Sequence, residues 1–241
     1  MAKTESKELA VIGPEVFNLT TIQQGSSDVT DNLDQIQIRL PQVKIIHQAQ
    51  MFEMPDGSKT QSFEGIILDF NKINSYWANS FDETGGGTPP DCFSLDGVRP
   101  SMLSADLQAN ACPDCPKNIF GSERNKKGEP GRGKACKNLK RVHIITNSNQ
   151  LLPFRLTLPP SNIKALDKYI SDLAAMGKRW RQSWTEFKLV PQKNKDGIVY
   201  AELVMTHTKD IPWDQAIMAK DIAGKLFPIL RDEVRQEEMA G

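Results

Sequence analysis

Four cysteines are the residues of this 241-residue sequence whose type and spacing suggest chemistry. Cys112 and Cys115 form a C-x-x-C pair, with Cys92 20 residues before it and Cys136 21 residues after it. The two-residue spacer lets both thiolates converge on one ion, and four thiolates complete the tetrahedral coordination of Zn²⁺. The sequence therefore predicts one structural Zn²⁺ per chain, held by Cys92, Cys112, Cys115 and Cys136.

The spacing leaves other interpretations of these cysteines open. A zinc ribbon has two C-x-x-C pairs, whereas this chain has one pair and two single cysteines. An iron–sulfur cluster, a redox dithiol, or buried free thiols beside a chance C-x-x-C are the alternatives. Pro116 follows the pair directly and no strand–C-x-x-C–helix pattern surrounds it, which argues against the dithiol. His143 is a further candidate ligand, but it lies in a strand pattern.

Residues 82–138, which contain the cysteines, show little periodicity and many Gly and Pro residues. A loop of this length inside a compact domain needs something that orders it. Metal binding would supply that order, because it is coupled to local folding. We therefore expect a zinc-binding loop inserted at about residues 82–138.

Charge is distributed unevenly although the net charge is zero. Residues 1–100 carry 7 basic and 14 acidic side chains, and residues 101–241 carry 23 and 16. Residues 116–141 alone have nine basic side chains against two acidic ones. Such a segment indicates an anionic partner, and a solvated lysine-rich loop is the alternative.

Two tryptophans lie in the strand pattern RWRQSWTEFKLV. Alternation places Phe187 and Leu189 on one face, and Trp180 and Trp184 on the other face with basic neighbours. Exposed aromatic rings beside cations suit unpaired nucleic acid, because bases stack on the rings and phosphates contact the cations. The alternative is that both indoles pack under the C-terminal helix or the cysteine loop. We predict nucleic-acid contacts from the following aromatic and basic residues: Tyr76, Trp77, Lys126, Lys127, Arg132, Lys134, Lys137, Lys140, Arg141, Arg155, Arg179, Trp180, Arg181, Trp184, Lys188 and Tyr200.

The remaining patterns predict a mainly β (α+β) fold. Strands are expected on both sides of a turn at residues 55–58, on both sides of residues 147–149, and on both sides of a turn that ends at Asp196-Gly197. A helix is expected from an N-cap at Ser161 to about Met176, and a second from Trp213 to about Glu238, kinked near Pro228. Consecutive strands with one helix before the last hairpin suit an OB-like antiparallel Greek-key barrel.

The expected organisation has three parts. Residues 1–40 form a partly ordered N-terminal arm, residues 41–210 form the barrel with its insertion, and residues 211–241 form the C-terminal helix and tail. No apolar run is long enough for a membrane span and no secretory signal is visible, so we expect no membrane partner and a cytoplasmic location. The phosphate-loop, dinucleotide, zinc-protease and nucleophile-elbow motifs are absent, and we expect no enzyme activity.

A set of short motifs surrounds the cysteines: Pro89-Pro90-Asp91-Cys92, Ser94-Leu95-Asp96-Gly97, Cys112-x-x-Cys115-Pro116, Phe120-Gly121-Ser122 and Gly133-Lys134-Ala135-Cys136-Lys137. This set resembles a family of phage and mobile-element proteins that are sometimes described as single-stranded DNA-binding. The resemblance covers about residues 40–210 and implies zinc at the four cysteines, an OB-like barrel and a role in phage DNA replication or recombination. The C-terminal sequence RDEVRQEEMAG departs from such proteins, because it is not a long acidic tail.

The sequence thus predicts a zinc-containing, non-catalytic protein that binds single-stranded DNA with little sequence preference. RNA is a second nucleic-acid candidate, and replication or recombination proteins are candidate partners. One alternative is a structural or protein-interaction module in which zinc only staples a loop. Another is a nuclease or recombinase subunit whose active site lies on another chain.

Overall fold

The computed structural model describes residues 19, 39–79, 89–124, 128–147, 152–193, 197 and 199–231. Most of the expected N-terminal arm, the predicted contacts Lys126 and Lys127, and the tail after Arg231 lie outside these residues.

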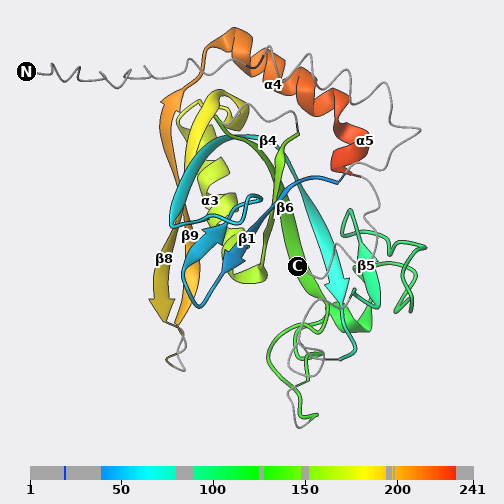
Figure 1. Cartoon of the computed structure of the whole chain (residues 1–241). Helices are drawn as coiled ribbons and strands as arrows, with labels where there is room; N and C mark the ends of the chain where they lie inside the picture. The colour runs from blue at the N-terminus through cyan, green and yellow to red at the C-terminus, as the bar shows by residue number, and fades with distance from the viewer. Residues whose placement is uncertain are drawn as a thin grey trace, which may run out of the picture.

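Within the described residues, nine strands form one sheet that curls strongly on itself (Figure 1). Eight of them follow the spatial order β3-β2-β1-β7-β6-β4-β8-β9, and β5 pairs with β4 beside this path. All pairings are antiparallel except that of β1 with β7, which is parallel and departs from the expected all-antiparallel sheet. The bounds are β1 Gln42–Ile46, β2 Met51–Glu53, β3 Lys59–Thr60, β4 Ser62–Tyr76, β5 Cys92–Ser94, β6 Lys137–Ile145, β7 Phe154–Leu158, β8 Ser183–Lys193 and β9 Val199–Asp210.

The three expected hairpins are present, with one change. β6 pairs with β7 and β8 pairs with β9, as the alternating patterns predict. The turn at residues 54–58 joins β2 to the short β3, and Gly57 there has a φ of 82°, which favours glycine. A second turn at residues 47–50 divides the first expected strand into β1 and β2.

The helices lie close to their predicted positions. α3 spans Pro160–Ala175 and ends before Gly177, whose φ is 70°. Its N-cap is Pro159, so the predicted Ser161 cap is wrong: Pro160 starts the helix at the position where a missing N–H costs nothing. α4 spans Trp213–Lys225 and α5 spans Phe227–Leu230. The helix is therefore interrupted at Leu226, just before Pro228, because proline cannot continue an α-helix without a kink or break.

Two apolar clusters fix the layers of the fold. The larger cluster fills the inside of the curved sheet, where Leu166, Tyr169 and Leu173 of α3 meet residues of β1, β2, β4, β6, β7, β8 and β9. The second lies on the other face, where α4 and α5 cover Leu68 and Ile145 together with Leu19 (Figure 1). The sheet is therefore covered on both faces in the region of β4 and β6.

Candidate metal centre and nucleic-acid interface

Strand pairing brings the four cysteines together from three stretches of the chain. Cys92 begins β5 and lies opposite Tyr76, the last residue of β4. Cys136 immediately precedes β6, which pairs with the same end of β4. Cys112 and Cys115 lie in the connection that leads into the short 3-10 helix η1, Pro116–Asn118. The long strand β4 therefore serves as the support of the whole site.

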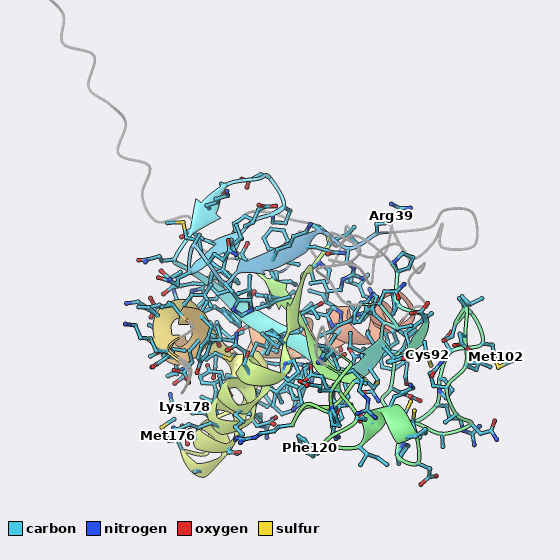
Figure 2. The ribbon with its side chains drawn as sticks, turned by 90° about the horizontal axis from the view of Figure 1, so that it is seen from below. Arg39, Cys92, Met102, Phe120, Met176 and Lys178 are labelled. Atoms are coloured by element: carbon cyan, nitrogen blue, oxygen red, sulfur yellow. The ribbon has the colours of Figure 1, made fainter. Side chains whose placement is uncertain are left out.

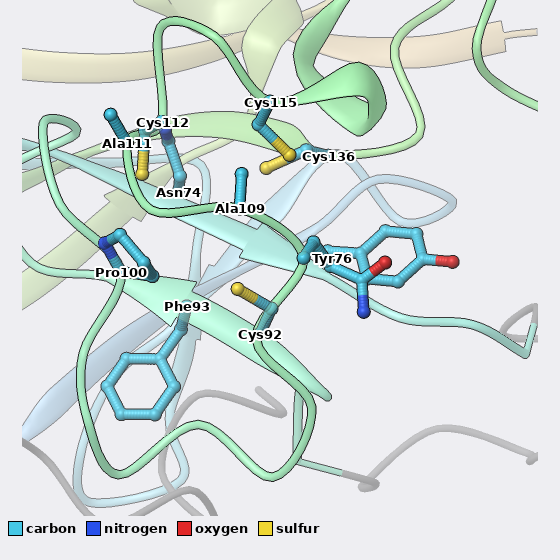
Figure 3. Close-up of a pocket in the computed structure, with 11 residues that line it drawn as sticks. Asn74, Tyr76, Cys92, Phe93, Pro100, Ala109, Ala111, Cys112, Cys115 and Cys136 are labelled. Atoms are coloured by element: carbon cyan, nitrogen blue, oxygen red, sulfur yellow. The ribbon is translucent and has the colours of Figure 1, made fainter.

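All four cysteines line one small cavity (Figure 3). The cavity volume is about 20 Å³, and Asn74, Phe93, Pro100 and Ala109 are among its other lining residues. In Figure 3 the sulfur atoms turn toward the space inside, with those of Cys115 and Cys136 next to each other in this view. Cys112, Cys115 and Cys136 are buried, whereas Cys92 is half-buried.

Backbone hydrogen bonds fix the loops that carry these thiols. The N–H of Cys112 donates to the carbonyl of Val98 at 2.8 Å, and that of Cys136 donates to the carbonyl of Lys117 at 2.8 Å. The side-chain amide of Asn118 donates to the carbonyl of Cys112 at 2.8 Å. The cysteine loops are therefore bonded to one another by main-chain atoms.

Burial and mutual proximity disfavour free thiolates at this site. Burial first, and then negative charge on Cys115, Cys112 and Cys92, raises the pKa of Cys136 to about 12, although Lys134 acts in the opposite direction. Burial also raises the pKa of Cys112, although hydrogen bonds with Ser94 and Asn74 act in the opposite direction. Cys112 and Cys136 are therefore protonated at neutral pH without a cation, so metal binding by these two thiols must release protons.

Within the described ranges, the side chains as placed form no group of three or more His, Cys, Asp or Glu that could hold a metal ion. Zinc needs its sulfur ligands at about 2.3 Å, so the thiols would have to draw inward around the cavity they already line. Their chemistry fits that ion, because a set of four thiols is typical of structural zinc. His143 does not line this cavity; it is fully buried on β6, opposite Asp69 of β4 and Arg155 of β7.

Four of the predicted nucleic-acid contacts are buried, and the expectation that they face solvent is wrong. One of them, Tyr76, is 9% exposed, with Lys117 over its ring at 5.1 Å. Trp184 is 4% exposed and packs with Ile66, Ile211 and Ala216 under the start of α4. Its predicted strand face was right, but α4 covers that face. Arg141 and Arg155 are 2% and 4% exposed because they lie on the sheet face that is covered in the region of β6.

Two further predicted residues are partly buried. Trp180 lies in the 3-10 helix η2 (Trp180–Gln182), not in the strand, and its ring contacts Phe70 edge-on at 5.6 Å. Arg181 donates from Nε to the carbonyl of Leu68 at 2.6 Å and lies 4.0 Å from Asp69. Their roles in this structure are packing and ion pairing.

The other predicted residues differ in how accessible they are. Arg132, Arg179 and Lys188 are exposed, and Trp77 and Tyr200 are half-buried. Lys137 pairs with Glu123, and Lys140 pairs with Asp167. Lys134 contacts the side chains of Asn118 and Asn138. Nucleic-acid contact by these residues stays a prediction.

Sequence reasoning missed three exposed aromatic rings that have a cation over them. Phe120 is 77% exposed with Lys134 Nζ at 5.0 Å from the ring centre, and Trp213 is 53% exposed with the Arg179 guanidinium at 4.8 Å. Phe227 is 53% exposed, with Arg231 at 5.3 Å. Phe120 lies in a non-periodic loop, so no strand or helix pattern could show its exposure. For Trp213, the sequence did contain a signal that could have suggested exposure, namely a large aromatic residue at the start of a predicted helix.

The sequence from residue 117 to residue 136, which follows the C-x-x-C pair and ends at Cys136, is here called the basic finger, and the structure describes residues 117–124 and 128–136 of it. Gly121 and Glu123 donate their N–H groups to the carbonyl of Gly133, and Gly131 donates to the carbonyl of Glu123. A Cβ on Gly133 would come within 2.2 Å of the Glu123 carboxylate, so the Glu123 side chain would have to move to admit it. Six basic and two acidic residues occur in this segment. Its sequence is thus positively charged, and its described residues are bonded to the cysteine loops.

None of the protein-family models, curated proteins or solved structures compared with this chain matches it. In the part of the chain that the structure describes, no helix has the length and apolar character needed to cross a membrane.

Proposed function

We propose that this protein binds single-stranded DNA and that one structural Zn²⁺ at the four cysteines holds the binding region in place. The observation that carries the proposal is the convergence of all four cysteines on one cavity at the base of the basic finger. The finger presents both components that unpaired nucleic acid requires, namely cations for the phosphates and an exposed ring for a base.

The donor chemistry of the cavity supports a metal. Four thiols surround a space suited to one ion, and Ser94 and Asn74 hydrogen-bond with the thiol of Cys112. Polar groups around a thiolate orient it and stabilise its charge. A metal there would join the loops of Cys92, the C-x-x-C pair and Cys136, which contain little regular secondary structure.

The distribution of exposed cations supports an anionic partner. Lys117 and Lys134 of the finger each lie over an aromatic ring, and Arg132 is exposed. A second aromatic–cation pair, Trp213 with Arg179, lies at the start of α4. Stacking and phosphate contacts depend little on sequence, so the proposed binding has little sequence preference.

The OB-like barrel and a role in replication or recombination remain parts of this proposal. The curled sheet and the helix α3 between β7 and β8 support an OB-like barrel. The parallel β1–β7 pair and the nine strands depart from its five-stranded antiparallel form. The role in replication or recombination rests on the resemblance of the cysteine motifs.

Fluorescence anisotropy with labelled oligo(dT), at several salt concentrations, tests the proposal. We expect tighter binding to oligo(dT) than to duplex DNA of equal length, and an affinity that falls as salt rises. The double variant Arg132→Gln/Lys134→Gln should flatten the salt slope by about 0.7 per lost phosphate contact. The matched control Lys164→Gln/Lys168→Gln, on α3, removes equal charge and should leave the slope unchanged. Absence of oligo(dT) binding by the metal-loaded native protein would contradict the proposal.

A protein-interaction module is the second candidate, and one exposed loop favours it. Val98, Met102, Leu103 and Leu107 are 46–82% exposed in the connection between Cys92 and the C-x-x-C pair. Figure 2 places Met102 at the edge of the molecule. Exposed apolar side chains gathered in one loop are typical of a protein contact. Bound zinc without oligo(dT) binding would favour this function.

A further inference from the structure

The basic finger presents an aromatic ring whose position is unusual for a phenylalanine. Phe120 is 77% exposed, and Figure 2 shows it at the edge of the molecule. Burying a phenylalanine side chain is worth about 1.5–3 kcal/mol, and this ring forgoes most of that gain. Lys134 lies over one face of the ring at 5.0 Å, and the exposed fraction leaves the opposite face to solvent.

Lys134 is held in place by two asparagines that are both tied to the cysteine site. Its Nζ donates to Asn118 Oδ1 at 3.1 Å and to Asn138 Oδ1 at 3.0 Å. Asn118 in turn donates to the carbonyl of Cys112, and Asn138 donates at 2.8 Å to Asn74, which lines the cysteine cavity. The position of the Lys134 ammonium group over the Phe120 ring therefore depends on the cysteine loops being held in place.

The backbone around Phe120 is tied to the same site. The N–H of Asn118 donates to the carbonyl of Cys115 at 2.9 Å, and the N–H of Cys136 donates to the carbonyl of Lys117. On the other side of the ring residue, Gly121 bonds to Gly133 at 2.9 Å. The exposed ring thus sits on a backbone that is fixed between Cys115 and Cys136.

We propose that Phe120 is a base-stacking residue for single-stranded nucleic acid, and that stacking there is coupled to metal binding at the four cysteines. This inference rests on the proposed function and adds a residue and a coupling to it. An unpaired base stacks on the open face of the ring, and its phosphate lies toward Lys134 and Arg132. Metal orders the finger before the base arrives, so the metal-loaded protein binds nucleic acid more tightly. By reciprocity, nucleic acid makes the protein hold its metal more tightly.

Two variants in the finger separate stacking from loss of apolar surface. Phe120→Ala removes the ring, whereas the matched control Ile119→Ala removes a neighbouring side chain that is 57% exposed and has no aromatic face. Neither side chain is buried, so both variants should melt within a few degrees of the native protein. We expect Phe120→Ala to bind labelled oligo(dT) roughly tenfold more weakly and Ile119→Ala to bind within about twofold of native. An abasic strand of equal length, which has nothing to stack, should bind native protein and Phe120→Ala equally.

Metal release to a chromogenic chelator reports the coupling independently of affinity. Oligo(dT) should slow release from the native protein and from Ile119→Ala, and it should have little effect on Phe120→Ala. Native binding to oligo(dT) with an unchanged affinity for Phe120→Ala would overturn the stacking assignment while leaving the proposed function intact. If Phe120→Ala binds oligo(dT) more weakly but oligo(dT) does not slow metal release from the native protein, the coupling would be overturned. Absence of oligo(dT) binding by the native protein would overturn the proposed function and this inference together.

Discussion

Replacing Trp184 with alanine should cost stability and should leave the affinity of each folded molecule for single strands unchanged. The indole is 4% exposed and packs against Ile66, Ile211 and Ala216 between β4 and α4. Burial of about 150–250 Å² at about 25 cal/mol per Å² gives roughly 4–6 kcal/mol, and measured losses for buried aromatic-to-alanine changes are about 3–5 kcal/mol. The hydrogen bond from Trp184 Nε1 to Glu64 at 2.6 Å adds little, because Glu64 is exposed and water replaces the donor.

Urea unfolding followed by far-ultraviolet circular dichroism measures this loss without depending on tryptophan emission. For a domain of this size, about 3–5 kcal/mol corresponds to a melting temperature lower by roughly 6–20 °C. The control Trp213→Ala removes an indole that is 53% exposed and should cost less than half as much. A Trp184→Ala protein within about 1 kcal/mol of native stability and about tenfold weaker for oligo(dT) would place this indole on the surface and refute the reasoning.

Three further predictions concern the cysteine site, the close approach of two strands and a buried histidine. Cys112→Ser should release metal and open residues 98–136 to limited proteolysis while the sheet keeps its circular dichroism signal, and loss of the whole β signal would contradict this. Gly65→Ala should cost about 1–3 kcal/mol in urea unfolding, because its Cβ would come within 2.7 Å of the Ile145 carbonyl, whereas Gly224→Ala on α4 meets no atom within 4 Å and should be neutral or stabilising. Burial and neighbouring arginines lower the pKa of His143 from 6.5 to about 3, so the unfolded chain binds the proton more tightly, and stability that is complete above pH 6.5 should fall by about 1.4 kcal/mol per pH unit below it. His143→Asn should flatten the urea stability profile between about pH 6.5 and 5, and parallel profiles for the two proteins would contradict the assignment.

Local patterns predicted those parts of the fold that local physics determines. Alternation in residues 152–158 predicted β7 with Leu156 and Leu158 buried, and helical spacing predicted α3 with Leu166 and Leu173 buried. Turn residues predicted the hairpins, because a turn is set by a few neighbouring side chains. The parallel pairing of β1 with β7 joins distant segments, and no local pattern specifies it.

In the candidate site, too, local patterns predicted some features, whereas contacts between distant segments determined others. Cysteine count and the C-x-x-C spacing predicted which thiols would come together, and all four line one cavity. Strand parity placed Trp184 on the correct face, but only tertiary packing determines that α4 covers that face. Arg155 shares this limitation, because a charged residue in a strand pattern suggests solvent, whereas the covered sheet face leaves it 4% exposed. Phe120 was missed because exposure in a non-periodic loop leaves no signal in the sequence.

Native mass spectrometry of the purified protein mixed with oligo(dT) tests the central claim most directly, since one spectrum reports metal and nucleic acid on the same molecules. The account predicts a species that contains one chain, one zinc ion and one oligonucleotide, and it predicts that Cys112→Ser reduces both the metal and the oligonucleotide. A folded chain that carries no metal and no oligonucleotide would contradict it.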